Sequence, residues 1–503
     1  MVTSQIIITS NNSVLSFIKM LKIALVCFIS LCAGWKVSGG NLDGYYTTSQ
    51  ISSILRTLEL NSTKGKVVSV GNTVQNRSIK AFHWENEGPS VLVIGTHHAH
   101  ELISSTQVLY LLDNFLKKQS LQDLRDRLDV WFIPVLNVDG YKAIEDDYSA
   151  TGRITEFRKN MKNLNCSLKL ENGVDLNRNY GFKWGADNLG SSSKKCSEDY
   201  RGPSAFSEPE TRAIRDLIDS RRFVMGVSYH SWGNLYIHPY GYTKTNSKEL
   251  VGNHWKLYSE LKNQICADCE MGTPTELLNY PANGCFMDYA HSKGLFALSV
   301  ELGESFHPLS TRIKDTLDKH SEPFEFLMWR VLPFLGSESA MLQMHHTGVQ
   351  LNLTVYNQGL TNASDSKVQI EFSENLTLRS LNSTQEVSFK NSTKPLVLTF
   401  SQIKNLSKVE IRMDLVFESV HVNSLDYNIT LSPQNNQKTH SFKLEPPVES
   451  TVVWEIVTVI CLVSAVAIIL LILYYKSEDK VELRRPQFQG EGEVLEPEEI
   501  RPV

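Results

Sequence analysis

The sequence carries almost no excess of charge of one sign. Its 50 lysines and arginines nearly balance its 55 aspartates and glutamates, so the formal net charge is only -5 over 503 residues. This balance predicts neither nucleic-acid binding nor an acidic tail. No internal repeat is evident either. The hydrophobic fraction of 41% is enough for two or three globular domains.

Long apolar runs lie near the two ends of the chain. At the first end, Lys19 and Lys22 precede an apolar run over residues 23–33, and small residues follow it. This pattern is typical of a secretory signal peptide, which we predict over residues 1–39 with cleavage near Gly39. A membrane anchor is the alternative, but the run is shorter than the roughly 20 residues that a span needs.

The second apolar run covers residues 456–475 and contains no charged residue, so it is long enough to cross a bilayer. A buried soluble helix and a removable lipid-anchor signal are the alternatives, and the long tail after the run disfavours the second. Basic side chains follow at once, and they place the tail over residues 476–503 in the cytoplasm: Lys476, Lys480, Arg484 and Arg485. We therefore expect a single-pass type I membrane protein whose larger part is extracellular or luminal.

No N-glycosylation sequon follows the second apolar run. The sequon asparagines between the two apolar runs are Asn61, Asn76, Asn165, Asn352, Asn362, Asn375, Asn382, Asn391, Asn405 and Asn428. Their crowding between residues 352 and 428 indicates an exported surface that carries N-glycans.

Cysteine is scarce, and only five of the eight cysteines lie between the two apolar runs: Cys166, Cys196, Cys266, Cys269 and Cys285. An oxidising compartment favours disulfides among them, and the odd number leaves at least one unpaired within the chain. Cys266-x-x-Cys269 lacks a second cysteine pair, which excludes a zinc finger. The pairing among the last three cysteines stays open.

Two different hydrophobic patterns divide the rest of the chain. Over residues 45–335, buried apolar runs alternate with helical periodicity, which predicts an α/β domain with a mixed, largely parallel sheet and helices on both faces. The apolar runs are residues 90–97, 128–140, 222–230 and 294–302. Over residues 340–445, short alternating runs separated by turn residues predict a small all-β sandwich without a catalytic cluster.

Polar residues that suit a metal site follow three of the apolar runs. His98 and Glu101 come after the first, His230 ends another, and Glu301 lies near the end of the last. In an open parallel sheet, ligands bind beyond the carboxyl ends of the strands, so these groups are expected to meet. Two histidines and a glutamate are a known ligand set for catalytic zinc, and a free glutamate beside its water can act as a general base.

The same residues resemble the zinc carboxypeptidases, in particular the carboxypeptidase A/B branch. The resemblance covers about residues 45–335 and rests on five segments in order: HAHE, GVDLNRNYGFKWG, SSSKKCSEDYRGPSAFSEPET, YHSWGNLYIHPYGY and SVELG. The first of these is weakly specific alone, whereas the ordered set is highly specific. The resemblance implies one zinc ion held by His98, Glu101 and His230, with Glu301 as the catalytic base.

The resemblance also implies the remaining roles. Asp175 would orient the first ligand histidine. Asn177 and Arg178 would bind the free carboxylate of the substrate, and Arg158 would stabilise the developing oxyanion. Tyr280 would close over the bound C-terminus. Cys166 and Cys196 would be paired, as a family disulfide is.

Some features depart from that branch. His100 replaces an arginine usually found just before the glutamate ligand, which puts substrate contacts in doubt but not zinc binding. His97 is interpreted as structural or solvated. The residues between the expected cleavage site and Tyr45 leave no room for a long inhibitory pro-segment, so we expect activity without activation cleavage.

The specificity pocket of that branch has at its base the residue seven positions after the closing tyrosine. Counting from Tyr280 gives Met287, whose flexible, uncharged thioether favours apolar or aromatic C-terminal residues. A shift of one position would put Asp288 there and reverse the preference. The expected function is thus a membrane-anchored zinc carboxypeptidase that trims peptide or protein C-termini, and the alternative is a catalytically silent surface receptor on the same fold.

Overall fold

The structure is a computed structural model that describes residues 37–244, 247–345, 348–372, 376–390, 395–417, 425–432 and 438–444. Within these ranges, no helix has both the length and the apolar character to cross a bilayer. The predicted membrane helix over residues 456–475, the tail over 476–503, and all but the last three residues of the predicted signal peptide over 1–39 lie outside the described residues.

The first part of the chain is built on an eight-stranded sheet. Its strands are β1 (Gly65–Asn72), β2 (Ser78–Trp84), β3 (Ser90–Gly95), β4 (Asp129–Ile133), β5 (Phe223–His230), β6 (Leu235–Ile237), β7 (Glu270–Gly272) and β8 (Phe296–Glu301). They lie in the order β1-β2-β4-β3-β5-β8-β6-β7. The four central strands, β4, β3, β5 and β8, are parallel, whereas β1, β2 and β6 pair antiparallel with a neighbour. The sheet is mixed with a parallel centre, as the sequence predicts.

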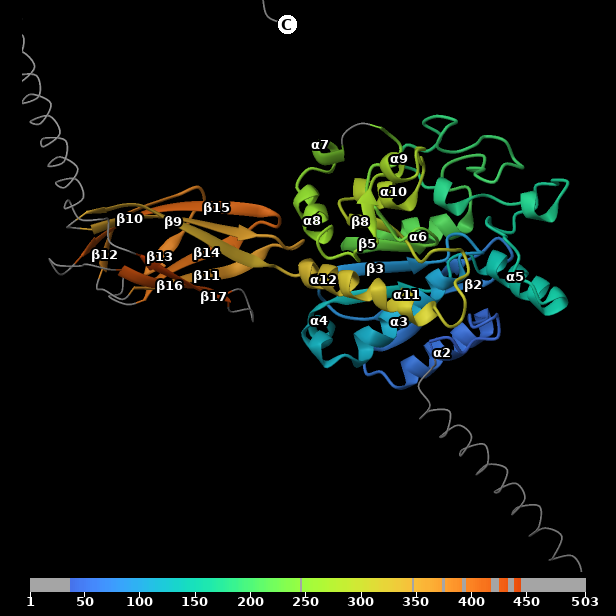
Figure 1. Ribbon diagram of the computed structural model, residues 1–503, viewed down its shortest axis with the longest axis horizontal. Coiled ribbons are helices and arrows are strands. Elements are labelled where there is room, and N and C mark those ends of the chain that lie inside the picture. Colours follow the sequence, from blue (N-terminus) through green and yellow to red (C-terminus); the bar gives the residue numbers. More distant parts are fainter. Residues whose placement is uncertain are drawn as a thin grey trace, which may run out of the picture.

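Helices cover both faces of this sheet (Figure 1). They are α2 (Thr48–Leu60), α3 (Leu102–Lys117), α4 (Gln122–Arg127), α5 (Val138–Thr151), α6 (Pro209–Ser220), α7 (Ser247–Val251), α8 (His254–Leu261), α9 (Pro274–Leu277), α10 (Phe286–Ser292), α11 (Ile313–Lys319) and α12 (Ser321–Val331), with short 3₁₀ turns at Gln119–Leu121, Lys169–Glu171 and Leu176–Arg178.

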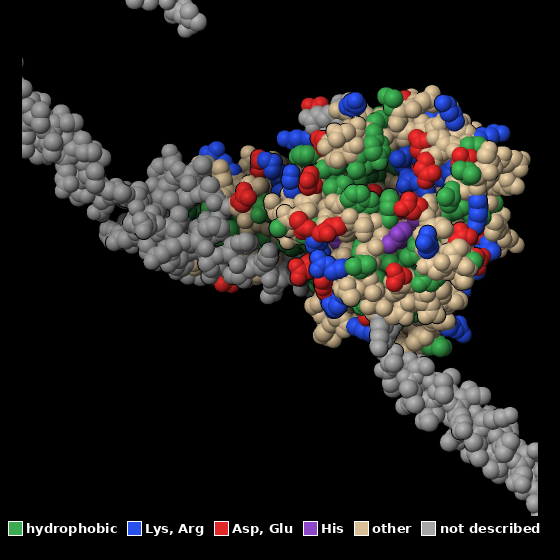
Figure 2. All heavy atoms as spheres, turned by 45° about the vertical axis from the view of Figure 1, so that its right-hand side comes forward, with side chains coloured by type: hydrophobic (Ala, Val, Ile, Leu, Met, Phe, Trp, Pro, Cys, Tyr) green, Lys and Arg blue, Asp and Glu red, His purple; other side chains and the backbone are tan. Residues whose placement is uncertain are grey.

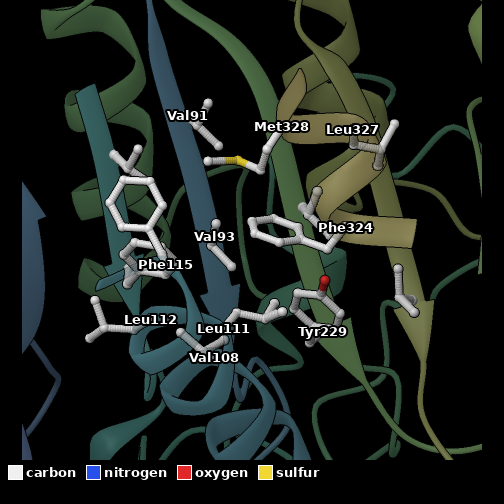
Figure 3. Packing of buried hydrophobic residues seen from close by; sticks show 14 of the residues in the cluster. Val91, Val93, Val108, Leu111, Leu112, Phe115, Tyr229, Phe324, Leu327 and Met328 are labelled. Atoms are coloured by element: carbon white, nitrogen blue, oxygen red, sulfur yellow. The ribbon is translucent and has the colours of Figure 1, made fainter. Parts of the chain in front are cut away.

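Strand β3 shows why the sheet is buried on both sides. Side chains alternate across a strand, so Val91 and Val93 face one core while Leu92 and Ile94 face the other. The first core is closed by α3 and α12, where Val93 lies close to Phe324 (Figure 3). The second core is closed by α6 and α10. A strand that is apolar on both faces is buried between two layers of helices. This burial fixes the position of the carboxyl end of β3.

The second part of the chain is all β. Strands β9 (Leu335–His345), β10 (Gly348–Asn357), β12 (Leu376–Ser383) and β15 (Ser407–Phe417) form a four-stranded sheet, and β11 (Ala363–Phe372), β13 (Ser388–Lys390), β14 (Leu396–Ile403), β16 (Leu425–Ser432) and β17 (Lys438–Leu444) form a five-stranded one. All their described pairings are antiparallel. Both sheets contribute to one apolar core, which includes Leu351 of β10 and Ile370 of β11. This is the sandwich arrangement that the alternating runs predict.

The two parts are joined without a spacer (Figure 1). Helix α12 ends at Val331 and β9 begins at Leu335. Leu360 donates its backbone N–H to the carbonyl of Arg330 at 2.7 Å, and the Thr361 hydroxyl donates to the carbonyl of Val331 at 2.8 Å. The turn after β10 therefore caps the end of α12.

A charged group reinforces this joint. The Arg330 guanidinium lies 3.0 Å from a Glu260 carboxylate oxygen and 3.7 Å from the centre of the Phe334 ring. Gln358, from the sandwich, donates to the other Glu260 oxygen at 3.0 Å. Gly359 is required here, because a Cβ on it would lie 2.0 Å from the Leu332 carbonyl oxygen. We call these residues the α12–β10 joint.

Candidate metal and substrate site

The loop after β3 carries two of the candidate ligands. Its path is set by Asn137, whose side-chain amide donates to the carbonyls of His97, Arg158 and Lys159 at 3.1–3.3 Å. Ala99, between the two candidate ligands, donates its N–H to the Arg158 carbonyl at 2.9 Å. The loop ends at Glu101, the N-cap of α3. These bonds hold the loop against the segment that carries Arg158.

Strands β5 and β8 supply two further groups at their carboxyl ends. His230 and Glu301 are the last residues of these parallel strands and are paired in register. The Leu302 N–H donates to the His230 carbonyl at 2.9 Å, which extends the pairing by one residue. The sheet thus places Glu301 beside a candidate ligand.

The candidate ligands converge on one point. His98 Nδ1 lies 2.7 Å from Glu101 Oε1, His230 Nδ1 lies 2.9 Å from Glu101 Oε2, and the two Nδ1 atoms are 3.3 Å apart. All three side chains are buried, and one ligand atom of each falls within 4.8 Å of the others. Two imidazole nitrogens and both oxygens of a carboxylate facing one another form a set that fits a metal ion, and zinc accepts these donors.

The far nitrogens of both histidines are held by other side chains. His98 Nε2 lies 3.2 Å from Asp175 Oδ1, and His230 Nε2 lies 2.9 Å from the Ser228 hydroxyl. Such contacts orient a ligand histidine and leave its other nitrogen for the metal. Asp175 also accepts two hydrogen bonds from the Arg158 guanidinium, at 2.9 and 3.1 Å, so that Arg158 is anchored beside the ligands.

Neighbouring positive charges keep the two buried carboxylates of this cluster ionised. Burial acts to raise the pKa of Asp175, but the charges of Arg158 and then His98 hold it well below its usual range. Burial likewise acts to raise the pKa of Glu101, and His98 and His230 hold it well below. Burial acts to lower the pKa of Arg158, which Asp175 and Glu101 nevertheless raise above its usual value. Both carboxylates are therefore negative and able to attract a cation.

Glu301 behaves differently from Glu101. Burial raises the pKa of its carboxyl to about 8, and the negative charge of Glu101 acts in the same direction. A carboxylate whose proton affinity is high can take a proton from a nearby water, which is what a general base requires. A dication bound by the neighbouring ligands would oppose this shift.

The residues predicted to bind the substrate carboxylate lie next to the ligands. Asn177 accepts a hydrogen bond from the Phe286 N–H at 2.9 Å, and its Nδ2 lies 3.4 Å from His230 Nε2. Arg178 donates from one terminal nitrogen to the Asn177 carbonyl at 3.0 Å, and its buried Nε has no hydrogen-bond partner among the described residues. Tyr280 lies before α10 with 46% of its surface exposed. Arg178 thus retains a donor that a ligand could use.

Met287 and Asp288 differ in what they touch. Met287, on α10, packs in the core, and its methyl group comes within 3.1 Å of the Cβ position of Gly241. Asp288 is fully buried, and its carboxylate accepts hydrogen bonds from the N–H groups of Gly241 at 2.9 and 3.0 Å and of Tyr242 at 3.2 Å. The Asp288 oxygens are thus bound by the backbone, whereas the buried Met287 side chain has apolar contacts in this core.

The other histidines of the loop are buried. His97 is fully buried, so its solvated interpretation is wrong. Burial lowers its pKa well below the usual value, and the charges of His230 and His98 add to this. His100 packs against the Phe306 ring, with ring centres 4.5 Å apart. In Figure 2, histidine atoms reach the surface near the middle of the larger unit, between acidic and basic side chains.

Among the described residues, the distances between sulfur atoms show which cysteines are paired. Cys166 is bonded to Cys196 and Cys266 to Cys269, while Cys285 is buried and free. The first disulfide ties together the segments that flank Asn177 and Arg178. The pairing left open by the sequence is therefore the short loop between Cys266 and Cys269.

Sequence reasoning missed Asn137 and Ser228. Ser228 had a signal: it lies two positions before His230 on a strand, so both side chains point to the same face. The sequence signal for Asn137 was its position before α5, where an asparagine can cap a helix. In the structure, its Oδ1 accepts the Gly140 N–H at 3.1 Å as the N-cap. That its amide also clamps two distant segments depends on tertiary structure.

Comparison with known proteins agrees with this geometry. The zinc carboxypeptidase family model matches residues 51–322. The chain is 29% identical over 243 residues to carboxypeptidase B of Helicoverpa zea, a match that covers 46% of this chain and 55% of that protein. It is 29% identical over 311 residues to metallocarboxypeptidase A of Trichophyton rubrum, which covers 58% of this chain and 68% of that protein.

A crystal structure of carboxypeptidase A from Helicoverpa armigera is also similar. The chain is 25% identical to it with a TM-score of 0.49, and the match covers 61% of this chain and 79% of that one.

Proposed function

Since the chain belongs to the zinc carboxypeptidase family, we propose that it is a zinc-dependent metallocarboxypeptidase that removes the C-terminal residue of peptides or proteins. The observation that carries this proposal is the convergence of His98, Glu101 and His230 beside Glu301 at the carboxyl ends of parallel strands. A receptor that had lost catalysis would not need to keep all four groups together.

The chemistry divides between the ion and the chain. A zinc ion held by the two histidines and Glu101 would supply a Lewis acid and an acidified water. Glu301 accepts the proton of the attacking water and returns it to the leaving amine, a role that its position beside His230 at the end of β8 supports. Arg158 is held by Asp175 beside the ligands, and its guanidinium stabilises the negative charge that develops on the scissile carbonyl oxygen.

Specificity for a chain end rests on a free carboxylate. Arg178 and Asn177 bind it, and the unpartnered Nε of Arg178 is one donor available for this. Tyr280 is exposed on its loop and closes over the bound residue. Met287 lines the base of the side-chain pocket and favours apolar or aromatic residues, since Asp288 is bound to backbone N–H groups instead.

We also propose that the enzyme is an exported, single-pass type I membrane protein with N-glycans. The support is the signal-like segment over residues 1–39, the apolar run over 456–475 with basic residues after it, and the sequons before it. Two of those sequons, at Asn352 and Asn382, lie on strands that flank Arg412 of β15 on either side. The role of the sandwich would then be to present the catalytic unit away from the membrane.

One assay tests the function. The full-length protein is incubated with a peptide ending in phenylalanine and with its C-terminally amidated twin, each with and without a zinc chelator. We expect release of single residues from the free acid only, lost with the chelator and restored by zinc. Glu301→Gln should bind zinc with little change and turn over at least ~100-fold more slowly. Equal cleavage of both peptides, or full activity of Glu301→Gln, would contradict the proposal.

A further inference from the structure

A continuous chain of buried polar side chains leads away from the candidate metal site. His230 Nε2 lies 2.9 Å from the Ser228 hydroxyl, the same hydroxyl lies 2.9 Å from His97 Nδ1, and His97 Nε2 lies 2.8 Å from the Tyr180 hydroxyl. Ser228, His97 and Tyr180 are fully buried, and His230 is 1% exposed. Among the described residues, the other contact of His230 Nε2, to Asn177 Nδ2, is longer at 3.4 Å.

Each of these four side chains can act as a hydrogen-bond donor or as an acceptor toward its neighbours in the series. A neutral imidazole carries one ring proton, on either nitrogen, and a hydroxyl can rotate its hydrogen. Two arrangements therefore place one hydrogen in each of the three contacts. In the outward arrangement, His230 Nε2–H donates to Ser228, Ser228 donates to His97 Nδ1, and His97 Nε2–H donates to Tyr180. In the inward arrangement, Tyr180 donates to His97 Nε2, His97 Nδ1–H donates to Ser228, and Ser228 donates to His230 Nε2.

The state of His230 Nδ1 selects between the two arrangements. In the inward one, His230 carries its proton on Nδ1 and donates it to Glu101 Oε2, 2.9 Å away. A metal ligand must instead offer the Nδ1 lone pair, which moves the ring proton to Nε2. His230 then needs an acceptor at Nε2, and Ser228 provides it only if its own hydrogen turns toward His97.

We infer that Ser228 and His97 are positioning residues for His230, and that metal binding reverses the hydrogen-bond direction along the chain from Tyr180 to His230. The inference rests on the proposed function in one respect, that a metal ion is held by the His98, Glu101 and His230 group. The total number of protons on the four side chains does not change: each imidazole moves its proton from Nδ1 to Nε2 by exchange with solvent during binding, and each hydroxyl rotates.

The second ligand histidine has no such freedom. His98 Nε2 faces Asp175, a carboxylate that only accepts hydrogen bonds, so its tautomer is fixed in one direction. The two histidines are thus held in different ways. The hydrogen bond of His98 keeps one direction, whereas that of His230 changes direction when the metal binds. Loss of the Ser228 hydroxyl should therefore affect the metal site without changing its ligands.

The ring nitrogens of His97 give the direct test. The full-length protein labelled with ¹⁵N in histidine is studied by NMR without metal and with one equivalent of zinc, and the His97 signals are assigned by their loss in His97→Gln. We expect the His97 proton on Nδ1 without metal and on Nε2 with zinc. One tautomer in both states, in protein that binds zinc, would overturn the inference. Failure to bind one zinc ion would instead overturn the proposed function.

Zinc affinity gives a second test with matched variants. Ser228→Ala should raise the zinc dissociation constant by about 10–100-fold, as loss of such a supporting contact does. Ser228→Thr keeps the hydroxyl and should stay close to the wild-type value. Ser299 is a buried serine in register with Ser228 on β8, so Ser299→Ala controls for the loss of a buried hydroxyl. An equal weakening by Ser299→Ala, or none by Ser228→Ala, would contradict a positioning role.

Discussion

Met287 and Asp288 are buried neighbours on α10, but only the Asp288 side chain is held by hydrogen bonds from the backbone. The Asp288 carboxylate is bound by the N–H groups of Gly241 and Tyr242, and burial raises its pKa to about 7. Met287 has no charge, so a lysine side chain buried against it would leave an ammonium unpaired, at an effective cost of several kcal/mol.

The first prediction follows from this difference. For peptides that differ only in the last residue, kcat/KM should be at least ~100-fold higher for phenylalanine or leucine than for lysine or arginine, equivalent to about 3 kcal/mol. Met287→Asp should narrow or invert the ratio. Leu309, an exposed residue in a loop after β8, provides a control, since Leu309→Asp adds the same charge and should leave the ratio unchanged. A wild-type preference for basic residues would show that another acidic group reaches the pocket.

For single residues, the sequence predicts which side chains belong to the site better than it predicts the contacts that those side chains make. The four residues at the strand ends could be chosen because polar side chains that follow buried runs must gather at one edge of a parallel sheet. The hydrogen bonds that hold the Asp288 carboxylate could not be predicted, because the loop whose backbone donates them lies almost fifty residues away in the chain. Nor could the burial of His97, since one strand end does not reveal what covers it.

At the scale of elements, the turn that begins α5 determines how precisely the site loop is held. Asn137 caps this helix with its oxygen and donates with its amide to three carbonyls from two other segments. Asn137→Ala should lower the free energy of unfolding by about 2–4 kcal/mol, since several buried carbonyls lose their donor. Zinc affinity should fall with it.

Asn137→Asp separates the two halves of this side chain. It keeps an acceptor for the Gly140 N–H but places a carboxylate against the carbonyls of His97, Arg158 and Lys159. We expect it to be at least as unstable as Asn137→Ala by denaturant unfolding. Wild-type stability of Asn137→Asp would mean that capping α5, rather than clamping the loop, is the function of this residue.

Helix α6 contains a carboxyl group that makes stability depend on pH. Burial raises the pKa of Glu210 in its first turn to about 7. A raised folded-state pKa stabilises the fold at low pH, and this contribution is lost as pH rises from about 4.5 through 7. Between pH 6 and 8.5, the wild type should lose on the order of 1 kcal/mol relative to Glu210→Gln, whose side chain does not titrate.

The measurement is denaturant unfolding of both proteins at several pH values. The exposed Asp216, on the same helix, shows how far the effect is specific. Asp216→Asn should follow the wild-type profile. Parallel profiles for the wild type and Glu210→Gln would contradict the assigned pKa.

At the scale of the whole molecule, the α12–β10 joint decides whether the two units move independently. Its stability comes from the Arg330–Glu260 pair, the Gln358 hydrogen bond and the packing of Phe334. Arg330→Met should leave the Glu260 charge unpaired and weaken the joint by about 1–3 kcal/mol, because the pair is only partly buried. Calorimetry should then separate one unfolding transition into two, while kcat/KM for a short peptide stays within about twofold.

Lys408 provides the matched control for this variant. It also pairs with a glutamate, Glu410, but both side chains are more than half exposed on β15. Lys408→Met should therefore leave the unfolding profile unchanged. The hydrophobic patterns of the sequence predict both units, but they do not predict the α12–β10 joint. The ion pair links residues that are distant in the chain, and Gly359 has no local signal for the close contact that it makes with Leu332.

The lack of a spacer between the units fixes how the candidate site is oriented relative to the sandwich. Because the turn after β10 is bonded directly to the end of α12, whatever immobilises the sandwich also fixes the direction in which Arg178 and Glu301 face. A freely diffusing peptide can approach from any angle and is not affected by this. If the protein is anchored in a membrane as we propose, a substrate protein in the same membrane would have to bring its C-terminus to one height and one orientation, and the length of its last flexible segment would decide whether it can be trimmed.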